Sequence, residues 1–278
     1  MWLVFALITA IFWAIGSALI KKTTVNLHNS VTYFLNASFF LAGWLIYRLF
    51  DGNFVWDFVS TLIAILPGLG FIYVLTAFSK AEVGLVTAVG SINPAITALL
   101  AVTFLGENLN PIQAGLISAI VFGVMVMSWP NKIKPTKSTR WLEWGLGFGL
   151  LSGLINLMMK LAISRSSTFS FSLTTALWQI LVALIWLSFS HQKQALKGLN
   201  TKKGRIGLLG TGLFNLGSMS SLLAIGAGKV SLVMPVVNMY VPLLLLFSTI
   251  WLKEKLTLRQ IVGAVAVVVC VAWLSLIS

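Results

Sequence analysis

Charged residues are scarce in this chain of 278 residues, and their scarcity excludes an ordinary soluble domain. Only 9% of the residues are charged and 58% are hydrophobic, whereas soluble domains carry about 25% charged residues. Cysteine is scarcer still, because Cys270 is the only one and lies inside an apolar run. No disulfide within the chain and no cysteine-based metal site are therefore expected. The composition predicts a polytopic membrane protein.

Acidic residues are few, and their positions exclude further classes. All six lie in expected connections or at the ends of apolar runs: Asp51, Asp57, Glu82, Glu107, Glu143 and Glu254. A proton-coupled pump or small-cation antiporter normally needs a carboxylate at mid-depth in the membrane, so the sequence disfavours both. No span contains a cluster of His, Cys or acidic residues, and no glycine loop suits a phosphate. We expect neither an enzyme nor a resident cofactor or metal.

Basic residues outnumber the acids by 19 to 6 and give a net charge of +13. Such a charge can indicate nucleic-acid binding, but these Lys and Arg residues stand in short connections between apolar runs. In those places basic side chains orient helices in a membrane and contact anionic lipid. The expected partners are membrane lipid and a small-molecule substrate, and not nucleic acid. The oligomeric state is left open.

Ten apolar runs approach the roughly 20 residues that a helix needs to cross a bilayer. The expected spans are 2–20, 31–50, 58–79, 83–104, 110–129, 142–162, 168–189, 205–226, 229–251 and 257–277. The first run lacks a basic leader and a small-residue cleavage pattern, so it is interpreted as a retained span. All ten runs together predict an all-α integral membrane fold.

Part of the sequence pattern occurs twice. Residues 84–129 match residues 231–276 at an offset of 147. The matched pairs include Leu85 with Leu232, Glu107 with Glu254, and Gln113 with Gln260. Polar residues at fixed spacing match by chance far less readily than leucines do. The duplication therefore indicates two related halves, a common construction of transporters.

The two halves are expected to have opposite orientations in the membrane. The connection 130–141 contains two prolines, which cannot continue a helix, and is expected to link the halves. Each half then contains five spans, and five is odd, so the second half enters the membrane from the opposite side. We predict a first five-helix repeat over residues 1–129 and a second, inverted one over residues 142–278.

The connections before the fifth and tenth spans carry matching helix-start signals. Asn110 is expected to be an N-cap, with Pro111 in the first turn and Gln113 as its capping-box partner. Thr257 and Gln260 repeat this pattern in the second half.

Two further pairs of charged residues correspond between the halves. Glu107 and Glu254 precede the two caps and are interpreted as interfacial helix-end residues, in preference to carboxylates that couple transport to an ion. A second correspondence, at an offset of 139, places Lys21 on Lys160.

Polar and aromatic residues within the spans are the candidates for substrate contact, because polar groups facing lipid are costly. The residues proposed to line a cavity are Trp13, Tyr73, Ser91, Asn93, Asn156, Asn215, Asn238 and Tyr240. The alternative is that such groups only join helices by hydrogen bonds, which is favoured for Ser and Thr. Pro94 and Pro242 are expected to kink the fourth and ninth spans.

The motifs resemble those of the drug/metabolite transporter superfamily, and within it the EamA-type ten-helix proteins. They are Phe-Trp-Ala-Ile-Gly-Ser with Lys21 closing the first span, Ser91-Ile-Asn-Pro94, Leu-Gly-Glu107-Asn-Leu-Asn, Asn238-Met-Tyr-Val-Pro242 and Leu-Lys-Glu254-Lys-Leu-Thr. The resemblance covers essentially the whole chain. It implies ten helices in two inverted halves, with a central cavity formed chiefly by helices 1, 3, 4, 6, 8 and 9. It does not indicate the substrate, because members move amino acids, sugars, nucleotide conjugates or quaternary amines.

The sequence favours a transporter of small metabolites that works by alternating access. A cavity of amide, hydroxyl and aromatic groups suits zwitterionic or uncharged solutes, and its aromatic rings suit quaternary ammonium. An exporter of amino acids or related solutes is the first choice, and an uptake carrier for sugar or choline-like solutes is the alternative. From another class, a membrane receptor or assembly factor that moves nothing stays open. The expected location is the inner (plasma) membrane of a prokaryote.

The orientation in that membrane is contested. Fifteen of the 19 Lys and Arg residues belong to the connections after the first, third, fifth, seventh and ninth spans. Short loops rich in Lys and Arg stay in the cytoplasm, so the charges predict that both chain ends lie outside. The resemblance implies the opposite, because ten-helix relatives are usually described with both ends in the cytosol. We favour the prediction from the charges.

Overall fold

The computed structural model describes residues 1–23, 29–50, 53–80, 83–129, 140–189, 201–252 and 256–278, and within these ranges the chain forms helices and no strand. The helices are α1 (Trp2–Thr23), α2 (Asn29–Tyr47), α3 (Phe58–Ile63), α4 (Leu66–Lys80), α5 (Val83–Gly90), α6 (Asn93–Leu105), α7 (Pro111–Ser128), α8 (Arg140–Arg165), α9 (Thr168–Phe189), α10 (Lys202–Ala227), α11 (Val230–Val237), α12 (Tyr240–Leu252) and α13 (Leu258–Leu276). In the described chain, 10 segments are long and apolar enough to span a membrane. The ten-helix all-α membrane fold predicted from the sequence is confirmed.

Three of these spans consist of two shorter helices each. They are the third (α3 and α4), the fourth (α5 and α6) and the ninth (α11 and α12). The observed bounds lie within a few residues of the expected ones. One difference reaches the expected linker 130–141, because α8 already begins at Arg140. The ring of Trp141 packs on that of Trp129, with centroids 6.2 Å apart, and this contact supports the extra helical residues.

The interrupted fourth and ninth spans have the same construction. The helices α5 and α11 have 8 residues each, and α6 and α12 have 13 each. All their bounds differ by the offset of 147 found in the sequence. Pro94 is the second residue of α6 and Pro242 the third of α12. In the first turn of a helix the missing N–H of proline costs no helical hydrogen bond, so each proline follows an interruption and does not kink a continuous helix.

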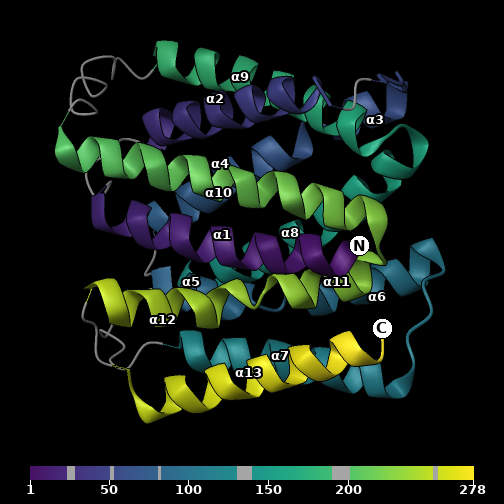
Figure 1. Ribbon diagram of the computed structural model, residues 1–278, viewed down its shortest axis with the longest axis vertical. Helices are drawn as coiled ribbons and strands as arrows, with labels where there is room; N and C mark the ends of the chain where they lie inside the picture. Colours follow the sequence, from purple (N-terminus) through teal and green to yellow (C-terminus); the bar gives the residue numbers. More distant parts are fainter. Residues whose placement is uncertain (24–28, 51–52, 81–82, 130–139, 190–200, 253–255) are drawn as a thin grey trace.

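The two halves make equivalent contacts with each other. α1 lies beside α10, α2 beside α9, and α7 beside α13 (Figure 1). The first span of each half contacts the third and fourth spans of the other: α1 packs on α10, α11 and α12, and α8 packs on α3, α4, α5 and α6. Five spans in each half give the halves opposite directions, which is the inverted arrangement expected from the sequence.

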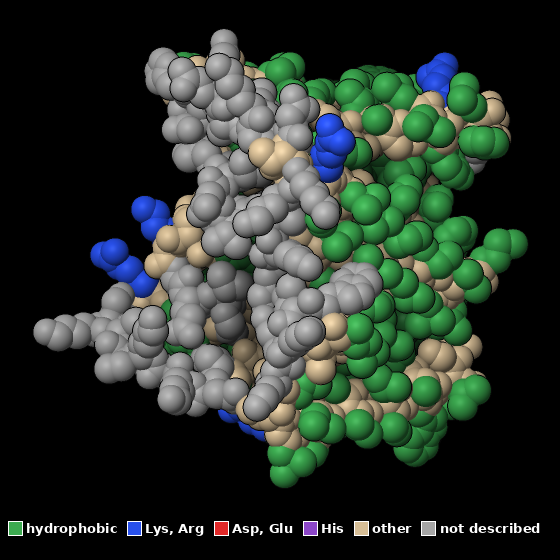
Figure 2. All heavy atoms as spheres, turned by 60° about the vertical axis from the view of Figure 1, so that its left-hand side comes forward, with side chains coloured by type: hydrophobic (Ala, Val, Ile, Leu, Met, Phe, Trp, Pro, Cys, Tyr) green, Lys and Arg blue, Asp and Glu red, His purple; other side chains and the backbone are tan. Residues whose placement is uncertain are grey.

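The bundle has two ends that differ in composition. Both chain ends lie at one of them, together with residues 48–50 and 53–57 and the connections 106–110, 166–167 and 228–229 (Figure 1); we call this end the terminal face. The other end holds the last turns of α1, α4, α7, α9 and α12. The sequence that follows those helices contains most of the Lys and Arg residues, so we call it the basic face. Hydrophobic side chains cover the flank between the faces, as contact with lipid requires (Figure 2).

Both predicted capping boxes are present. The side chain of Asn110 accepts a hydrogen bond of 2.8 Å from the backbone N–H of Gln113, whose side chain accepts one of 3.1 Å from the Asn110 N–H. Thr257 and Gln260 form the same reciprocal pair at the start of α13. The matching polar positions of the two halves therefore fix the starts of their last helices.

Candidate functional site

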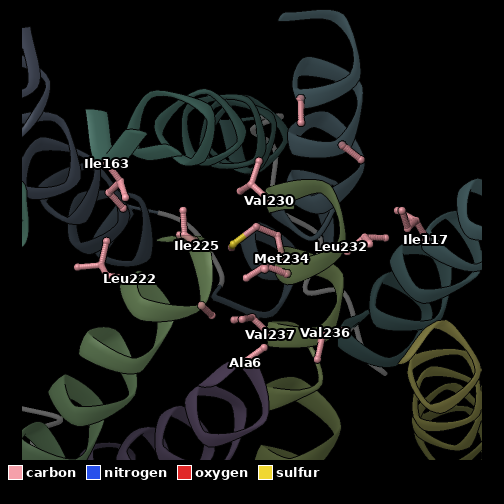
Figure 3. Close-up of a cluster of buried hydrophobic side chains, with 14 of the residues drawn as sticks. Ala6, Ile117, Ile163, Leu222, Ile225, Val230, Leu232, Met234, Val236 and Val237 are labelled. Carbon is pink, nitrogen blue, oxygen red and sulfur yellow. The ribbon is translucent and has the colours of Figure 1, made fainter. Parts of the chain in front are cut away.

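The half-helix α11 is buried on all sides. Each of its eight residues, Val230 to Val237, is buried. Side chains from α1, α7, α8 and α10 surround it, among them Ala6, Ile117, Ile163, Leu222 and Ile225 (Figure 3). A helix that is apolar on every side belongs in a protein interior. α11 therefore fills the interior of the bundle between the terminal face and the interruption of the ninth span.

Unpaired amide groups lie beside the two interruptions. Asn93 is the first residue of α6, and Asn238 directly follows α11. The Oδ1 atom of Asn93 and the Nδ2 atom of Asn238 are buried and have no hydrogen-bond partner among the described residues. Most buried polar atoms in proteins have a partner, so two unpaired amide atoms beside the interruptions of two matching spans need an explanation. Ser91 offers no such orphan, because its hydroxyl donates to the carbonyl of Ala88 over 2.6 Å.

Trp13 and Tyr240 meet in an aromatic cluster formed by α1, α10 and α12. The Trp13 ring stacks on Phe214 with centroids 5.5 Å apart, and it contacts Tyr240 edge to face at 5.6 Å. The indole N–H of Trp13 donates a hydrogen bond of 3.0 Å to the hydroxyl of Ser218. This bond fixes the ring in one orientation against its neighbours.

Asn156 and Tyr73 lie where α8 packs on helices of the first half. Asn156 on α8 donates a hydrogen bond of 3.0 Å to Thr97, and Thr97 in turn donates one of 2.8 Å to the backbone carbonyl of Asn93. Asn156 thus belongs with the interruption of the fourth span. Tyr73 packs on Trp144 of α8, with ring centroids 5.2 Å apart.

Asn215 joins helices through its Nδ2 group, whereas its buried Oδ1 atom has no hydrogen-bond partner among the described residues. Its Nδ2 group donates to the side chain of Asn36 over 3.0 Å and to the carbonyl of Thr211 over 2.9 Å. The first bond links α10 to α2, and the residue is 2% exposed. Such a contact between helices is the alternative that the sequence left open for polar residues.

A polar cluster at the terminal face was not among the predicted site residues. Glu107 and Lys160 line a cavity of about 430 Å³ together with Trp2, Gln113 and the 227–229 turn. The Glu107 carboxylate binds the first turn of α11, and Lys160 binds the last carbonyls of α10. The matching pairs Glu107/Glu254 and Lys21/Lys160 were the sequence signal for this cluster. Glu254 and the side chain of Lys21 lie outside the described residues.

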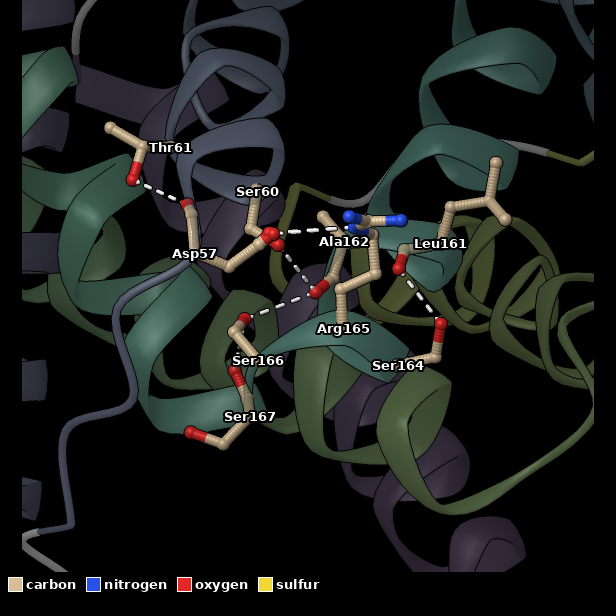
Figure 4. Close-up of polar contacts among 9 residues, drawn as sticks. All are labelled: Asp57, Ser60, Thr61, Leu161, Ala162, Ser164, Arg165, Ser166 and Ser167. Atoms are coloured by element: carbon tan, nitrogen blue, oxygen red, sulfur yellow. Dashed lines mark hydrogen bonds and ion pairs between the residues drawn. The ribbon is translucent and has the colours of Figure 1, made fainter.

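Acidic residues of the described chain lie at helix ends. Asp57 precedes α3 and Glu143 is in the first turn of α8, whereas Asp51 and Glu82 lie outside the described residues. Asp57 pairs with Arg165 over 3.2 Å and joins α3 to the end of α8 (Figure 4). The Arg165 side chain is 56% exposed, and exposed pairs contribute only about 0–1 kcal/mol. Within the described ranges no group of three or more His, Cys, Asp or Glu residues could hold a metal ion.

Ten membrane-spanning helices in two inverted halves, with interrupted helices at equivalent places, define the class of transporter-type membrane proteins. The EamA-like transporter family model matches residues 1–129 and 139–276, so the chain belongs to the EamA-like transporter family. A solved crystal structure has the same fold, with a TM-score of 0.84 and 12% sequence identity, and the match covers 99% of this chain and 96% of that one. No curated protein matches the sequence.

Proposed function

We propose that this protein carries a small metabolite across the membrane by alternating access, and that the substrate binds beside the interruptions of the fourth and ninth spans. The observation that carries the proposal is the pair of orphan amide atoms at Asn93 and Asn238. In a transporter, interrupted helices near mid-depth present free polar groups to a solute. A bound solute would supply the partners that these buried amides lack.

The chemistry of these residues favours a zwitterionic or uncharged solute. An amide group offers both a donor and an acceptor, so a pair of them suits a molecule with an ammonium and a carboxylate, or with hydroxyls. The rings of Trp13 and Tyr240 add an aromatic wall near the start of α12. We propose an amino acid or related solute and export as the direction; uptake of a sugar or a choline-like solute is the second candidate, because the aromatic wall also suits quaternary ammonium.

The arrangement of the half-helices supports a two-state carrier. α6 and α11, the halves next to the terminal face, pack on each other. On the basic side, α5 packs on α8 and α7, and α12 packs on α1. The described conformation is accordingly closed at the terminal face, and transport requires a second state in which α6 and α11 separate.

Flux into proteoliposomes tests the proposal. Purified protein would first be screened for thermal stabilisation by a library of amino acids, sugars and quaternary amines, because a ligand that binds only the folded state raises the midpoint of unfolding. Ligands found in this way would then be used in flux assays. A stabilising ligand that is moved supports a carrier. A ligand that binds but is never moved by the reconstituted protein supports the receptor class instead.

Replacing Asn238 or Tyr240 by alanine is expected to reduce transport at least tenfold and the folded yield by less than twofold. Each change would remove a contact with the solute; Asn238→Ala would leave the helix contacts of α11 in place, and Tyr240→Ala would also remove the ring contact with Trp13. Asn215→Ala is the matched control, since its amide joins α10 to α2. That variant should lose folded yield and transport in parallel. If Asn238→Ala also lost both in parallel, Asn238 would be a packing residue and the proposed site would be wrong.

A further inference from the structure

We propose that Glu107 is the latch that keeps the terminal face closed, and that its carboxylate must leave the first turn of α11 before this face can open. The proposal rests on the proposed function, because it describes one closed state of an alternating-access carrier. Glu107 belongs to the first half of the chain and α11 to the second. A face opens only when the bonds between the halves on that side break.

The Glu107 carboxylate is bound by three donors of α11. The backbone N–H of Val230 donates to its Oε1 atom over 2.9 Å, and that of Ser231 donates to its Oε2 atom over 3.0 Å. The hydroxyl of Ser231 also donates to Oε2. The first N–H groups of a helix have no partner within the helix and carry partial positive charge, so a carboxylate is the favoured cap there. Here the cap comes from a residue more than a hundred positions away.

The backbone before Glu107 directs the carboxylate toward α11. Gly106 ends α6 in the left-handed conformation, with φ 66°, which residues with a side chain rarely adopt. The backbone N–H of Glu107 then donates to the carbonyl of Ala101 over 3.2 Å. This turn fixes the position of the residue before its side chain makes any contact.

The turn between α10 and α11 is held from its other side by Lys160. Its Nζ group donates to the carbonyls of Ile225, Gly226 and Gly228 over 2.7, 3.3 and 2.8 Å. A cation is the favoured group at the negative end of a helix, just as an anion is at the positive end. The turn is thus clamped between opposite charges, with Lys160 on the carbonyls of α10 and Glu107 on the N–H groups of α11. Lys160 and α10 both belong to the second half. The bonds of Lys160 can therefore hold the turn together after the Glu107 carboxylate has left α11.

Opening requires α11 to move, because this helix is buried and packs on α6. Its N-terminal turn is the part closest to solvent, since Leu232 and the 227–229 turn line the cavity of about 430 Å³. Water that enters this cavity can solvate the Glu107 carboxylate once it is released. The other contact between the 106–110 and 227–229 connections is weaker, since it runs from the exposed Lys229 to the carbonyl of Asn108 over 3.2 Å.

A buried cysteine in α11 reports on this opening. Val233 is 0% exposed and lies one turn into α11, so Val233→Cys in a Cys270→Ala background should react slowly with a water-soluble maleimide. Adding Glu107→Gln removes the charge at constant size and should raise the labelling rate about tenfold, since a hydrogen bond to a charged group typically contributes that factor. Ser231→Ala removes only one of the three donors and keeps the carboxylate in place, so it should also raise the rate, but by a smaller factor than Glu107→Gln.

Arg165→Gln is the matched control. It removes a charge at the same face and breaks a contact between the halves, but it leaves α11 untouched. Its labelling rate should stay within twofold of the parent. If Glu107→Gln does not elute as a folded protein in gel filtration, the milder Ser231→Ala decides the question.

Unchanged labelling in folded Ser231→Ala and Glu107→Gln, or an equal rise in Arg165→Gln, would overturn the latch. Labelling needs no substrate, so the two proposals fail separately. If labelling is faster in the Glu107 and Ser231 variants but the reconstituted protein moves no solute, the proposed latch stands and the proposed transport function is wrong. If the protein moves a solute but labelling in these variants is unchanged, the proposed function stands and the latch is wrong.

Discussion

Gly16→Leu is expected to abolish folding of the protein into a monodisperse species. A Cβ atom at position 16 would lie 2.7 Å from the carbonyl oxygen of Gly210 and 2.7 Å from the backbone nitrogen of Phe214. Real Cβ contacts are almost never this short, and backbone atoms cannot rotate away as a side chain does. α1 and α10 form the most extensive helix contact in the described chain. A leucine at position 16 would therefore separate the two helices along most of their length.

The smaller Gly16→Ala substitution tests the same close contact at a lower cost in folding free energy. Overpacking by a single group typically costs about 1–3 kcal/mol, so Gly16→Ala should fold with a reduced yield and a lower unfolding midpoint. Small residues at helix contacts are the usual basis of helix association in membranes, because they permit close approach of the backbones. The effect should extend to the aromatic cluster, since Trp13 lies on α1 and its partner Ser218 on α10.

Gly115 provides the matched control for Gly16. It is also a glycine within a membrane-spanning helix, α7, but a Cβ atom there would meet nothing within 4 Å. Gly115→Leu should elute in gel filtration and unfold like the parent protein, because the new side chain faces lipid. Equal losses in both leucine variants would mean that glycine is needed at these positions for a reason other than close helix packing.

Features that depend on local sequence could be predicted without the structure. The ten spans follow from apolar length, and the capping boxes at Asn110 and Thr257 follow from residues three positions apart. The interrupted spans also have a sequence signal, since Pro94 and Pro242 match in the two halves within one residue of the 147 offset. The inverted arrangement follows from an odd number of spans in each half. None of these inferences needs knowledge of a contact between distant residues.

Contacts between distant residues could not be predicted in this way. The bond between Val230 and Glu107 joins positions 123 apart, and nothing in either local sequence specifies its partner. The sequence placed Glu107 at a helix end, which is correct, but the helix that its side chain caps belongs to the other half. Asn215 illustrates the same limit, because nothing in the sequence around it indicates that its Nδ2 group donates to Asn36 on another helix.

The orientation of the protein in the membrane should follow its charges, with the terminal face outside the cell. Moving Lys and Arg across a membrane during insertion is unfavourable, and short loops rich in these residues remain in the cytoplasm. The described part of the terminal face carries Arg48, Lys160, Arg165 and Lys229, whereas the other 15 of the 19 basic residues stand in the sequence that connects the first, third, fifth, seventh and ninth spans to the next ones. The bias is spread over several connections, so no single loop decides it.

Single cysteines test this orientation after Cys270 has been replaced by alanine. On intact cells, an impermeant thiol reagent should label a cysteine added after Ser278 and spare one at Gln194, a position outside the described residues; permeabilised cells should show both labels. The reverse pattern would place both chain ends in the cytosol, as the family resemblance implies, and would leave the fold unchanged.

If the expected pattern is found, the closed terminal face is the outer one. The conformation described would be closed to the outside, and the Glu107 latch would control release of an exported solute.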